Sequence, residues 1–329
     1  MIINIIIIDI IKGEERSRQE VDINDLKIFQ TVAEHGSVSK AARELSYVQS
    51  NVTARIQQLE HELGTTLFSR HRKGVALNAD GRKLLEYTQK ILKLMDDMKQ
   101  AFHDPEDPSG PLLIGTVETV SSLPGLLSTY CKHYPRVDLS LVTGVTEHLM
   151  NEVLQYQLDG AFVTGPIRHA EMEQDYLIEE DLVLIAKKDD DCDSLEQCLD
   201  KPLLVFRAGC GYRARLVQWL GQQGVAPAKI MEFGTLETIL AMVSSGLGIS
   251  LVPKSTITHL EAAGGLRCFT LPEQFSRITT VFIRRRDSLL GATMQKFLDN
   301  VHAFHQRNGA SVASPNSEGR FESDRLSAG

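Results

Sequence analysis

Residues 37–73 read SVSKAARELSYVQSNVTARIQQLEHELGTTLFSRHRK, and this stretch decides the fold of the N-terminal part of the chain. Ser37 can cap a short helix, because its hydroxyl can accept a hydrogen bond from a free backbone N–H group of the first turn. The inward positions of that helix are Ala41, Ala42 and Leu45. The turn SYVQ follows, and apolar residues at three- and four-residue steps predict a second helix over 49–63. The small residues of the first helix allow the second to cross it closely.

The exposed face of the second helix carries polar side chains near its start, and basic residues follow the helix. The polar group is Gln49, Ser50, Asn51, Thr53 and Arg55. Such side chains can reach base edges in a major groove. The basic group is Arg70, Arg72 and Lys73, where a wing would contact phosphate, and Ser37 and Lys40 are further candidates for the DNA-binding surface. The pattern favours a DNA-reading helix pair with a basic wing, although periodicity alone also fits a plain helical hairpin.

The charge distribution agrees with this interpretation. Residues 37–83 contain eight Lys or Arg against four acidic residues, whereas the whole chain of 329 residues has a net charge of −8. A basic segment in an acidic protein is expected when a single domain contacts phosphate.

Three motifs in this region resemble the LysR-type family of bacterial transcriptional regulators. They are F-x-x-V-A-E-x-G-S-x-S-x-A-A (29–42), L-S-Y-V-Q-S-N-V-T (45–53) and I-x-x-L-E-x-x-L-G-x-x-L-F-x-R (56–70). Many members place Arg directly after the Ser or Thr of the recognition helix, whereas this chain has Ala54 there and Arg55 one step later. The resemblance implies a winged helix-turn-helix, a long linker helix and a two-lobed α/β effector-binding domain similar to type 2 periplasmic binding proteins.

A long helix is expected over 80–102, after the DNA-binding unit at 21–79, whose first helix should run from Asn24 to His35. Its apolar residues alternate three- and four-residue steps, as in a coiled-coil seam. They are Leu84, Tyr87, Ile91, Leu94, Met95, Met98 and Phe102. Packing onto its own domain is one alternative. The family resemblance favours pairing with a second subunit, in a homodimer or homotetramer.

The C-terminal half reads as an α/β domain. We place the linker helix at 80–103, a hinge rich in Pro and acidic residues at 104–111 and the effector-binding domain at 112–307. Strand-like runs alternate with helical ones, as in an open α/β sheet. Lobe one is expected at about 112–182 and 277–307, ending in a helix over 288–305, and lobe two at about 183–276.

Candidate effector-binding residues lie where strands run into helix starts, because the free N–H groups there favour an anion. The set is Thr116, Thr119, Ser121, Thr164, Arg207, Cys210, Tyr212 and Thr235. Plain helix capping is as good an account of Thr119 and Ser121, and a surface ion pair of Arg207. Cys210 lies between two glycines near Arg207 and Arg213, where the pKa of a thiol could fall. A redox or nucleophilic role and a small residue tolerated in a tight loop both remain open.

The leading interpretation is a ligand-responsive transcriptional regulator. We expect it to be cytoplasmic, without enzymatic activity, cofactor or membrane contact. Its partners would be a pseudo-palindromic promoter site and a small anionic effector, with RNA polymerase kept as a candidate. The alternative is an α/β enzyme or solute-binding module whose helical N-terminus serves as a dimerisation arm. The motif G-x-G at 246–248 is too weak to support nucleotide binding.

Two terminal segments and the cysteines complete the expectations. Residues 1–20 are interpreted as a leader extension, with translation starting at Val21, and 308–329 as a disordered tail. Five cysteines without C-x-x-C spacing favour reduced thiols, although Cys192 and Cys198 could form a redox pair.

Overall fold

A computed structural model describes residues 21–72, 74–102, 104–189, 194–227 and 229–308. The chain divides into two compact units, the first ending at Asp96 and the second starting at Asp97. The expected leader and residues 309–329 of the expected tail lie outside the described residues, as do Lys73 and Cys192. Asn308, the first residue of the expected tail, is instead the last residue of a helix.

The first unit is built on three short helices around one core. They are α2 (Ile23–His35), α3 (Val38–Glu44) and α4 (Gln49–Leu63). Helix α2 starts at Asp22, whose carboxylate accepts the N–H of Asn24, and it ends at Gly36 in the left-handed conformation. The expected first helix and the helix over 49–63 are therefore confirmed. The three- and four-residue spacing also predicts a buried Leu63, but this residue lies at the C-terminal end of α4 and is exposed.

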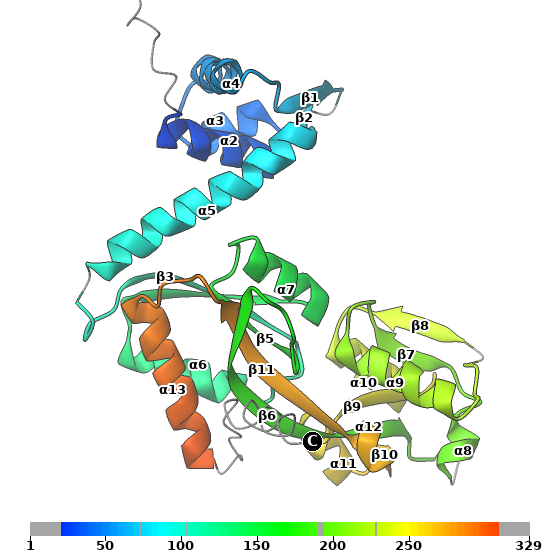
Figure 1. The fold of residues 1–329 in the computed structure, drawn as a ribbon. Coiled ribbons are helices and arrows are strands. Elements are labelled where there is room, and N and C mark those ends of the chain that lie inside the picture. The colour runs from blue at the N-terminus through cyan, green and yellow to red at the C-terminus, as the bar shows by residue number, and fades with distance from the viewer. Residues whose placement is uncertain (1–20, 73, 103, 190–193, 228, 309–329) are drawn as a thin grey trace, which may run out of the picture. The chain divides into compact units, whose positions relative to one another are not determined.

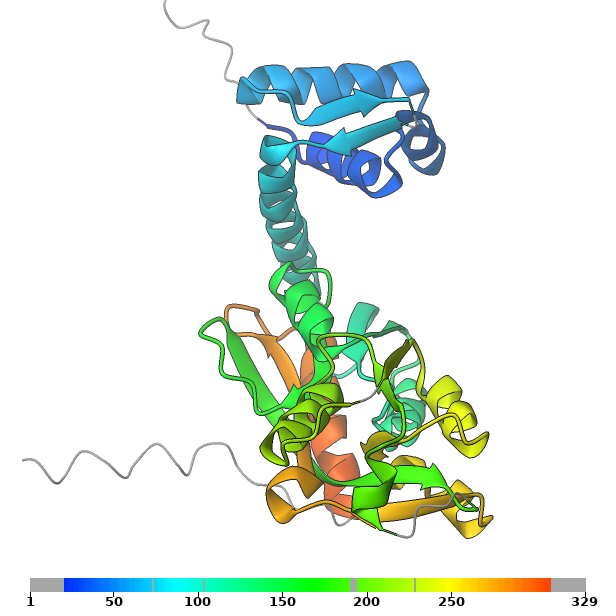
Figure 2. The ribbon, with the colours of Figure 1, turned by 90° about the vertical axis from the view of Figure 1, so that its right-hand side faces the viewer.

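A β-hairpin and the larger part of a long helix complete this unit. The elements are β1 (Phe68–His71), β2 (Gly74–Leu77) and α5 (Ala79–Ala101). The two strands pair antiparallel, and a groove between the hairpin and α4 is lined by residues of both, which Figure 2 shows side by side. Gly74 has φ +139°, and a Cβ at this position would collide with the carbonyl oxygen of Gly36. Glycine here lets the hairpin approach the end of α2.

The first lobe of the second unit has a βαβαβ start, as the sequence predicts. Its elements are β3 (Gly110–Thr116), α6 (Leu123–His133), β4 (Val137–Thr143), α7 (Thr146–Leu154) and β5 (Gly160–Gly165). Strand β3 pairs parallel with both β4 and β5. Parallel pairing follows from the crossover helices between the strands.

The chain then crosses to the second lobe and returns. The crossing and returning strands are β6 (Met172–Lys187) and β11 (Arg277–Arg285), and the last helix is α13 (Ala292–Asn308). In between lie α8 (Leu195–Cys198), β7 (Leu203–Phe206), α9 (Gly211–Gln222), β8 (Ile230–Phe233), α10 (Leu236–Ser244), β9 (Ser250–Pro253), η1 (Lys254–Thr256), α11 (Thr258–Ala262), β10 (Leu266–Thr270) and α12 (Glu273–Ser276).

One mixed sheet joins the lobes, in the order β10-β6-β11-β5-β3-β4, with β9 also paired to β6. Strands β6 and β11 run antiparallel through both lobes (Figure 1). Two separate cores form around them: lobe one contains Ile178 and Val281, and lobe two contains Leu182 and Ile278. The lobes therefore have independent cores linked by two long strands.

Helix α13 returns to lobe one and packs on α6, where Tyr130 and Phe297 make an edge-to-face contact. The helix begins at Ala292, not at Ser288 as expected. The reason is a turn after β11: the N–H of Arg286 donates to Glu171 O, and the hydroxyl of Ser288 donates to Arg285 O.

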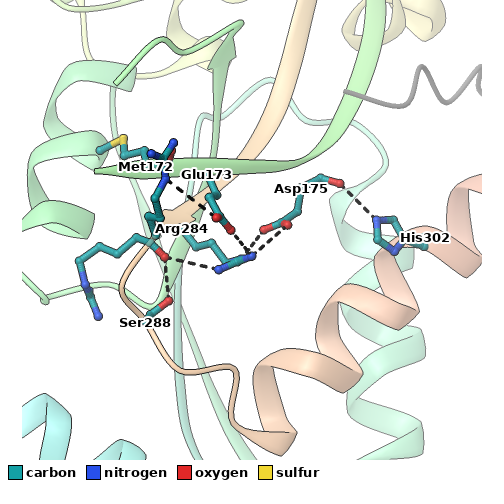
Figure 3. Close-up of polar contacts among 8 residues, drawn as sticks. Met172, Glu173, Asp175, Arg284, Ser288 and His302 are labelled. Atoms are coloured by element: carbon teal, nitrogen blue, oxygen red, sulfur yellow. Dashed lines mark hydrogen bonds and ion pairs between the residues drawn. The ribbon is translucent and has the colours of Figure 1, made fainter. Parts of the chain in front are cut away.

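A buried arginine links the end of β11 to the start of β6 through hydrogen bonds and ion pairs (Figure 3). Arg284 donates to the carboxylates of Glu173 and Asp175, and its side chain is one-tenth exposed. His302 of α13 lies 3.2 Å, through Nε2, from the carbonyl oxygen of Asp175. Because every partner belongs to lobe one, we interpret this cluster as a structural tie between two strands and α13.

Candidate nucleic-acid interface and ligand cavity

Helices α3 and α4 form the crossing pair that the sequence predicts. The hydroxyl of Ser37 accepts the N–H of Lys40 and caps α3. Ala41 and Ala42 are buried, and Val52, Ile56 and Leu59 of α4 point into the same core. The apolar stripe of α4 is thereby fixed inward, and its polar residues face outward.

The exposed start of α4 is rich in hydrogen-bonding groups. Gln49, Ser50 and Asn51 are exposed, whereas Thr53 donates from its hydroxyl to the carbonyl oxygen of Gln49 at 2.9 Å. The N-cap residue is Val48, which offers no side-chain hydrogen bond and is 69% exposed. Val48 and its exposed neighbour Tyr47 were not among the residues predicted from the sequence. The sequence could have indicated them, because both are apolar residues in the turn directly before the polar start of α4.

Arg55 has a different environment from the one expected. Its guanidinium lies 3.2 Å from the carboxylate of Asp25 and 4.0 Å from that of Asp22. The Asp25 side chain is only 2% exposed, and burial raises the pKa of this carboxyl above its usual range while Arg55 opposes the rise. Arg55 is thus engaged within its own domain in this structure, and its assignment as a base or phosphate contact stays a prediction. Asp25 was missed because no local pattern links it to a residue thirty positions away.

Basic side chains lie on the hairpin. Arg70 and Arg72 are exposed, and so is Lys40 at the start of α3. Lys73, the third expected phosphate contact, lies outside the described residues. At the open end of the hairpin, the side-chain amide of Asn78 donates to Thr66 O at 2.6 Å, directly before α5.

Helix α5 carries an apolar face that the single chain leaves open. Tyr87, Ile91, Leu94 and Met98 are exposed, and Phe102, directly after the helix, is 87% exposed. Met95 is half-buried. Leu84 was expected in the same apolar seam, but it lies near the start of the helix and packs against the core of the first unit.

The second unit contains a cavity of about 470 Å³ between its lobes. Lobe one contributes Val117, Glu118, Thr119, Thr143, Gly144, Val145, Thr146 and His148. Lobe two contributes Phe206, Arg207, Ala208, Cys210, Tyr212 and Gly234. Four of the eight expected effector residues therefore line one cavity: Thr119, Arg207, Cys210 and Tyr212.

The other four expected residues do not line it. The hydroxyl of Thr116 donates to Val117 O, and Thr235 caps α10 by accepting the N–H of Thr238. Ser121 lines a different cavity of about 440 Å³, and Thr164 lies against Gly211 with its hydroxyl buried. Thr116 and Thr235 thus use their hydroxyls within their own segments.

Four cavity residues connect the lobes or carry charge. The hydroxyls of Thr119 and Tyr212 bond to each other across the lobes, and burial raises the pKa of Tyr212 far above its ordinary value. Arg207 is exposed and has no ion-pair partner among the described residues. Glu118, whose carboxylate accepts the N–H of Leu236 at 2.6 Å, was not predicted from the sequence.

The cysteines require two corrections. Burial raises the pKa of the Cys210 thiol, which outweighs the N–H groups and the Arg213 charge that lower it. This is the opposite of the expected fall, and an exposed reactive thiolate is not favoured here. Cys131, Cys210 and Cys268 are free thiols, but Cys198 is disulfide-bonded, so the expectation of reduced thiols is wrong for that residue.

Metal-binding and membrane-spanning features are absent from the described ranges. No group of three or more potential metal-ligating side chains occurs there. Likewise, none of the described helices combines the length and hydropathy that crossing a bilayer requires.

Comparisons with known proteins identify the family. The family model "LysR substrate binding domain" matches residues 105–306, and the model "Bacterial regulatory helix-turn-helix protein, lysR family" matches 23–82. The HTH-type transcriptional regulator CzcR of Bacillus cereus is 54% identical over 288 residues, which cover 88% of this chain and 99% of that protein. The chain belongs to the LysR family of transcriptional regulators. A second relative, the HTH-type transcriptional regulator SoxR of an Arthrobacter species, is 53% identical over 281 residues, or 85% of this chain and 96% of that protein.

Solved structures of LysR-type regulators share the fold. A full-length OxyR variant from Pseudomonas aeruginosa superposes with a TM-score of 0.65 at 22% identity, covering 85% of this chain and 94% of that one. CbnR in complex with its target DNA gives a TM-score of 0.60 at 23% identity, covering 86% and 99%. At these identities the likeness concerns the fold alone. The α3–α4 pair thus belongs to the helix-turn-helix domain, and the cavity to the substrate-binding domain.

Proposed function

We propose that this LysR-type regulator binds a pseudo-palindromic promoter site through α4 and the hairpin and responds to a small anionic effector held in the cavity between the lobes. The exposed polar start of α4 carries the first part of the proposal. Gln49, Ser50 and Asn51 face solvent on a helix whose other face is buried, an arrangement suited to reading base edges.

Phosphate contacts would surround this reading face. Arg70 and Arg72 of the hairpin and Lys40 of α3 are exposed cations. Ser37 and Thr53 already make intramolecular hydrogen bonds, so they would contact DNA only with their remaining hydrogen-bonding capacity. Lys73 stays a candidate from the sequence. Arg55 is proposed to position α4 instead of touching DNA, because it is paired with Asp25.

Dimerisation would place two reading helices on one operator. The open apolar face of α5, formed by Tyr87, Ile91, Leu94 and Met98, supports pairing with the same helix of a second subunit. The structure of CbnR was solved with its target DNA, and we propose the same class of partner here. A homotetramer, contact with RNA polymerase and a cytoplasmic location belong to this proposal.

The lining of the cavity favours an anionic ligand. Arg207 is an exposed guanidinium without an ion-pair partner among the described residues, and it can grip a carboxylate through two N–H groups. Cys210 is the N-cap of α9, whose first N–H groups add positive potential nearby. Thr119 and Tyr212 add hydroxyls at the same wall. A metabolite with one acidic group, of a size that fits about 470 Å³, is the proposed class.

The test is a footprint of the full-length chain on the DNA upstream of its own gene. We expect protection of a two-fold-related site at nanomolar protein and a steep loss of affinity with salt. Gln49→Ala should relax base preference and cost about 1–3 kcal/mol. The matched control is Gln58→Ala, since Gln58 is exposed on the same helix but bonds to Glu62 near its far end. Weak binding to every duplex would instead favour the dimerisation-arm alternative.

A further inference from the structure

Glu118 makes a contact between the lobes that none of the expectations includes. It follows β3 in lobe one, and its Oε2 accepts the N–H of Leu236, the first residue of α10 in lobe two, at 2.6 Å. Thr235 already satisfies a different N–H group of this helix, that of Thr238. The carboxylate of Glu118, which belongs to the opposite lobe, therefore lies at the N-terminal end of α10. This helix has nine residues, and the free N–H groups at its N-terminus carry a partial positive charge.

Two further contacts join the lobes around the same cavity. The hydroxyls of Thr119 and Tyr212 bond to each other, and the N–H of Glu147 points at Gly209 O at 3.5 Å. Both pairs are neutral, and the second is long. The Glu118 contact carries a formal charge, and charge-assisted hydrogen bonds are about twice as strong as neutral ones. Because the Glu118 contact is exposed, solvent screens its charge, whereas the Thr119–Tyr212 contact is buried. Of the three contacts, the Glu118 contact is therefore the charged one that an anion from solution can reach.

We propose that Glu118 acts as a latch, that is, its carboxylate holds the N-terminus of α10 in lobe two against lobe one. An anion from solution that binds at this N-terminus must displace the carboxylate. The inference rests on the proposed function of the cavity as an effector site. Glu118 and Gly234 both line the cavity, so an acidic group entering there meets a helix end that is already neutralised. Binding at that end and release of the lobes are then linked, because a ligand shifts an equilibrium by preferring one state.

A simple helix cap is the competing explanation, and it predicts a different response. If Glu118 only capped α10, its loss would affect the amides of α10 alone. A latch also controls the Glu147–Gly209 contact, whose amide belongs to α7 on lobe one. Hydrogen exchange at the Glu147 amide therefore reports on separation of the lobes, and exchange at the Leu236 amide reports on the end of α10.

The experiment is hydrogen exchange of the full-length chain, resolved to single amides, for the wild type, Glu118→Ala and Glu118→Gln. The control is Glu237→Ala, which removes an exposed acid from the first turn of α10 in lobe two. In Glu118→Ala we expect exchange to become about tenfold faster at Leu236 and faster at Glu147 as well. Glu118→Gln keeps an acceptor without charge and should give a smaller increase at both amides. Glu237→Ala should leave Glu147 unchanged.

Sulfate serves as the anion probe, with chloride at equal ionic strength as its control. Sulfate should slow exchange at Leu236 in Glu118→Ala, and in the wild type it should speed exchange at Glu147 while Leu236 stays protected. Unchanged exchange at Glu147 in Glu118→Ala would overturn the latch and leave a cap. Equal effects of sulfate and chloride would overturn the competition with anions. Because no effector is used, either failure is distinguishable from failure of the proposed effector site.

Discussion

Replacing Arg55 by Gln should destabilise the first unit instead of removing a DNA contact. The Asp25 carboxylate is 2% exposed and depends on Arg55, whose own side chain is 41% exposed. A buried acceptor left without its partner costs about 1–3 kcal/mol, and more when it is charged. Solvent reaches the arginine, which reduces the contribution of the pair. We expect a loss of about 2 kcal/mol in local stability, or exchange of the α2 and α4 amides about thirtyfold faster.

The loss should depend on pH. Burial raises the pKa of Asp25 in the folded chain, and removing Arg55 raises it further, because the coulombic attraction that lowers it is lost. A carboxyl whose folded pKa lies above its unfolded value binds protons more tightly in the folded state. The stability of the folded chain therefore falls as the pH rises from the unfolded pKa of Asp25 to its higher folded pKa. The defect of Arg55→Gln should be full at pH 7.5 and should shrink as the pH falls toward the ordinary pKa of Asp, about 4.

The assay is hydrogen exchange of the full chain at pH 5 and pH 7.5, corrected for intrinsic exchange rates. Arg43→Gln is the matched control, since Arg43 is exposed in the same unit and its Nε bonds only to a backbone oxygen. The double variant Asp25→Asn with Arg55→Gln should recover most of the lost protection, because no buried charge remains. Unchanged exchange in Arg55→Gln together with a loss of operator binding would refute this reasoning and return Arg55 to the DNA contacts.

Three further predictions concern the other surfaces. Arg72→Ala should lower the slope of log affinity against log salt by about one, measured by fluorescence anisotropy; an unchanged slope would remove the hairpin from the interface. Ile91→Glu combined with Met98→Glu should give monomers in sedimentation, because both exposed residues lie on the open face of α5, and an unchanged mass would exclude that face. Arg207→Ala should weaken binding of an acidic effector by about 1.5–3 kcal/mol in calorimetry, whereas wild-type affinity would exclude Arg207 as its anchor.

The sequence alone was sufficient for the local elements of the first unit. Periodicity located α4 at its observed bounds, and Ser37 marked where α3 begins. These features depend on residues three to four positions apart, which is the distance over which helix faces and caps are set. The ordered motifs between residues 29 and 70 also pointed to the correct family. The alternating pattern after residue 112 predicted the α/β class, because strand and helix periods are likewise local properties.

Tertiary structure decided which side chains meet. Arg55 finds Asp25 thirty residues away, and Glu118 finds Leu236 across the lobes, so neither pairing has a local signal. Four of the eight expected effector residues line the cavity, because the direction of each side chain depends on how a strand turns into its helix. Burial likewise reversed the expected direction of the Cys210 pKa. Spacing along the chain determines which face a residue lies on, whereas its partners, its burial and therefore its charge state are set by segments that the fold brings together from a distance.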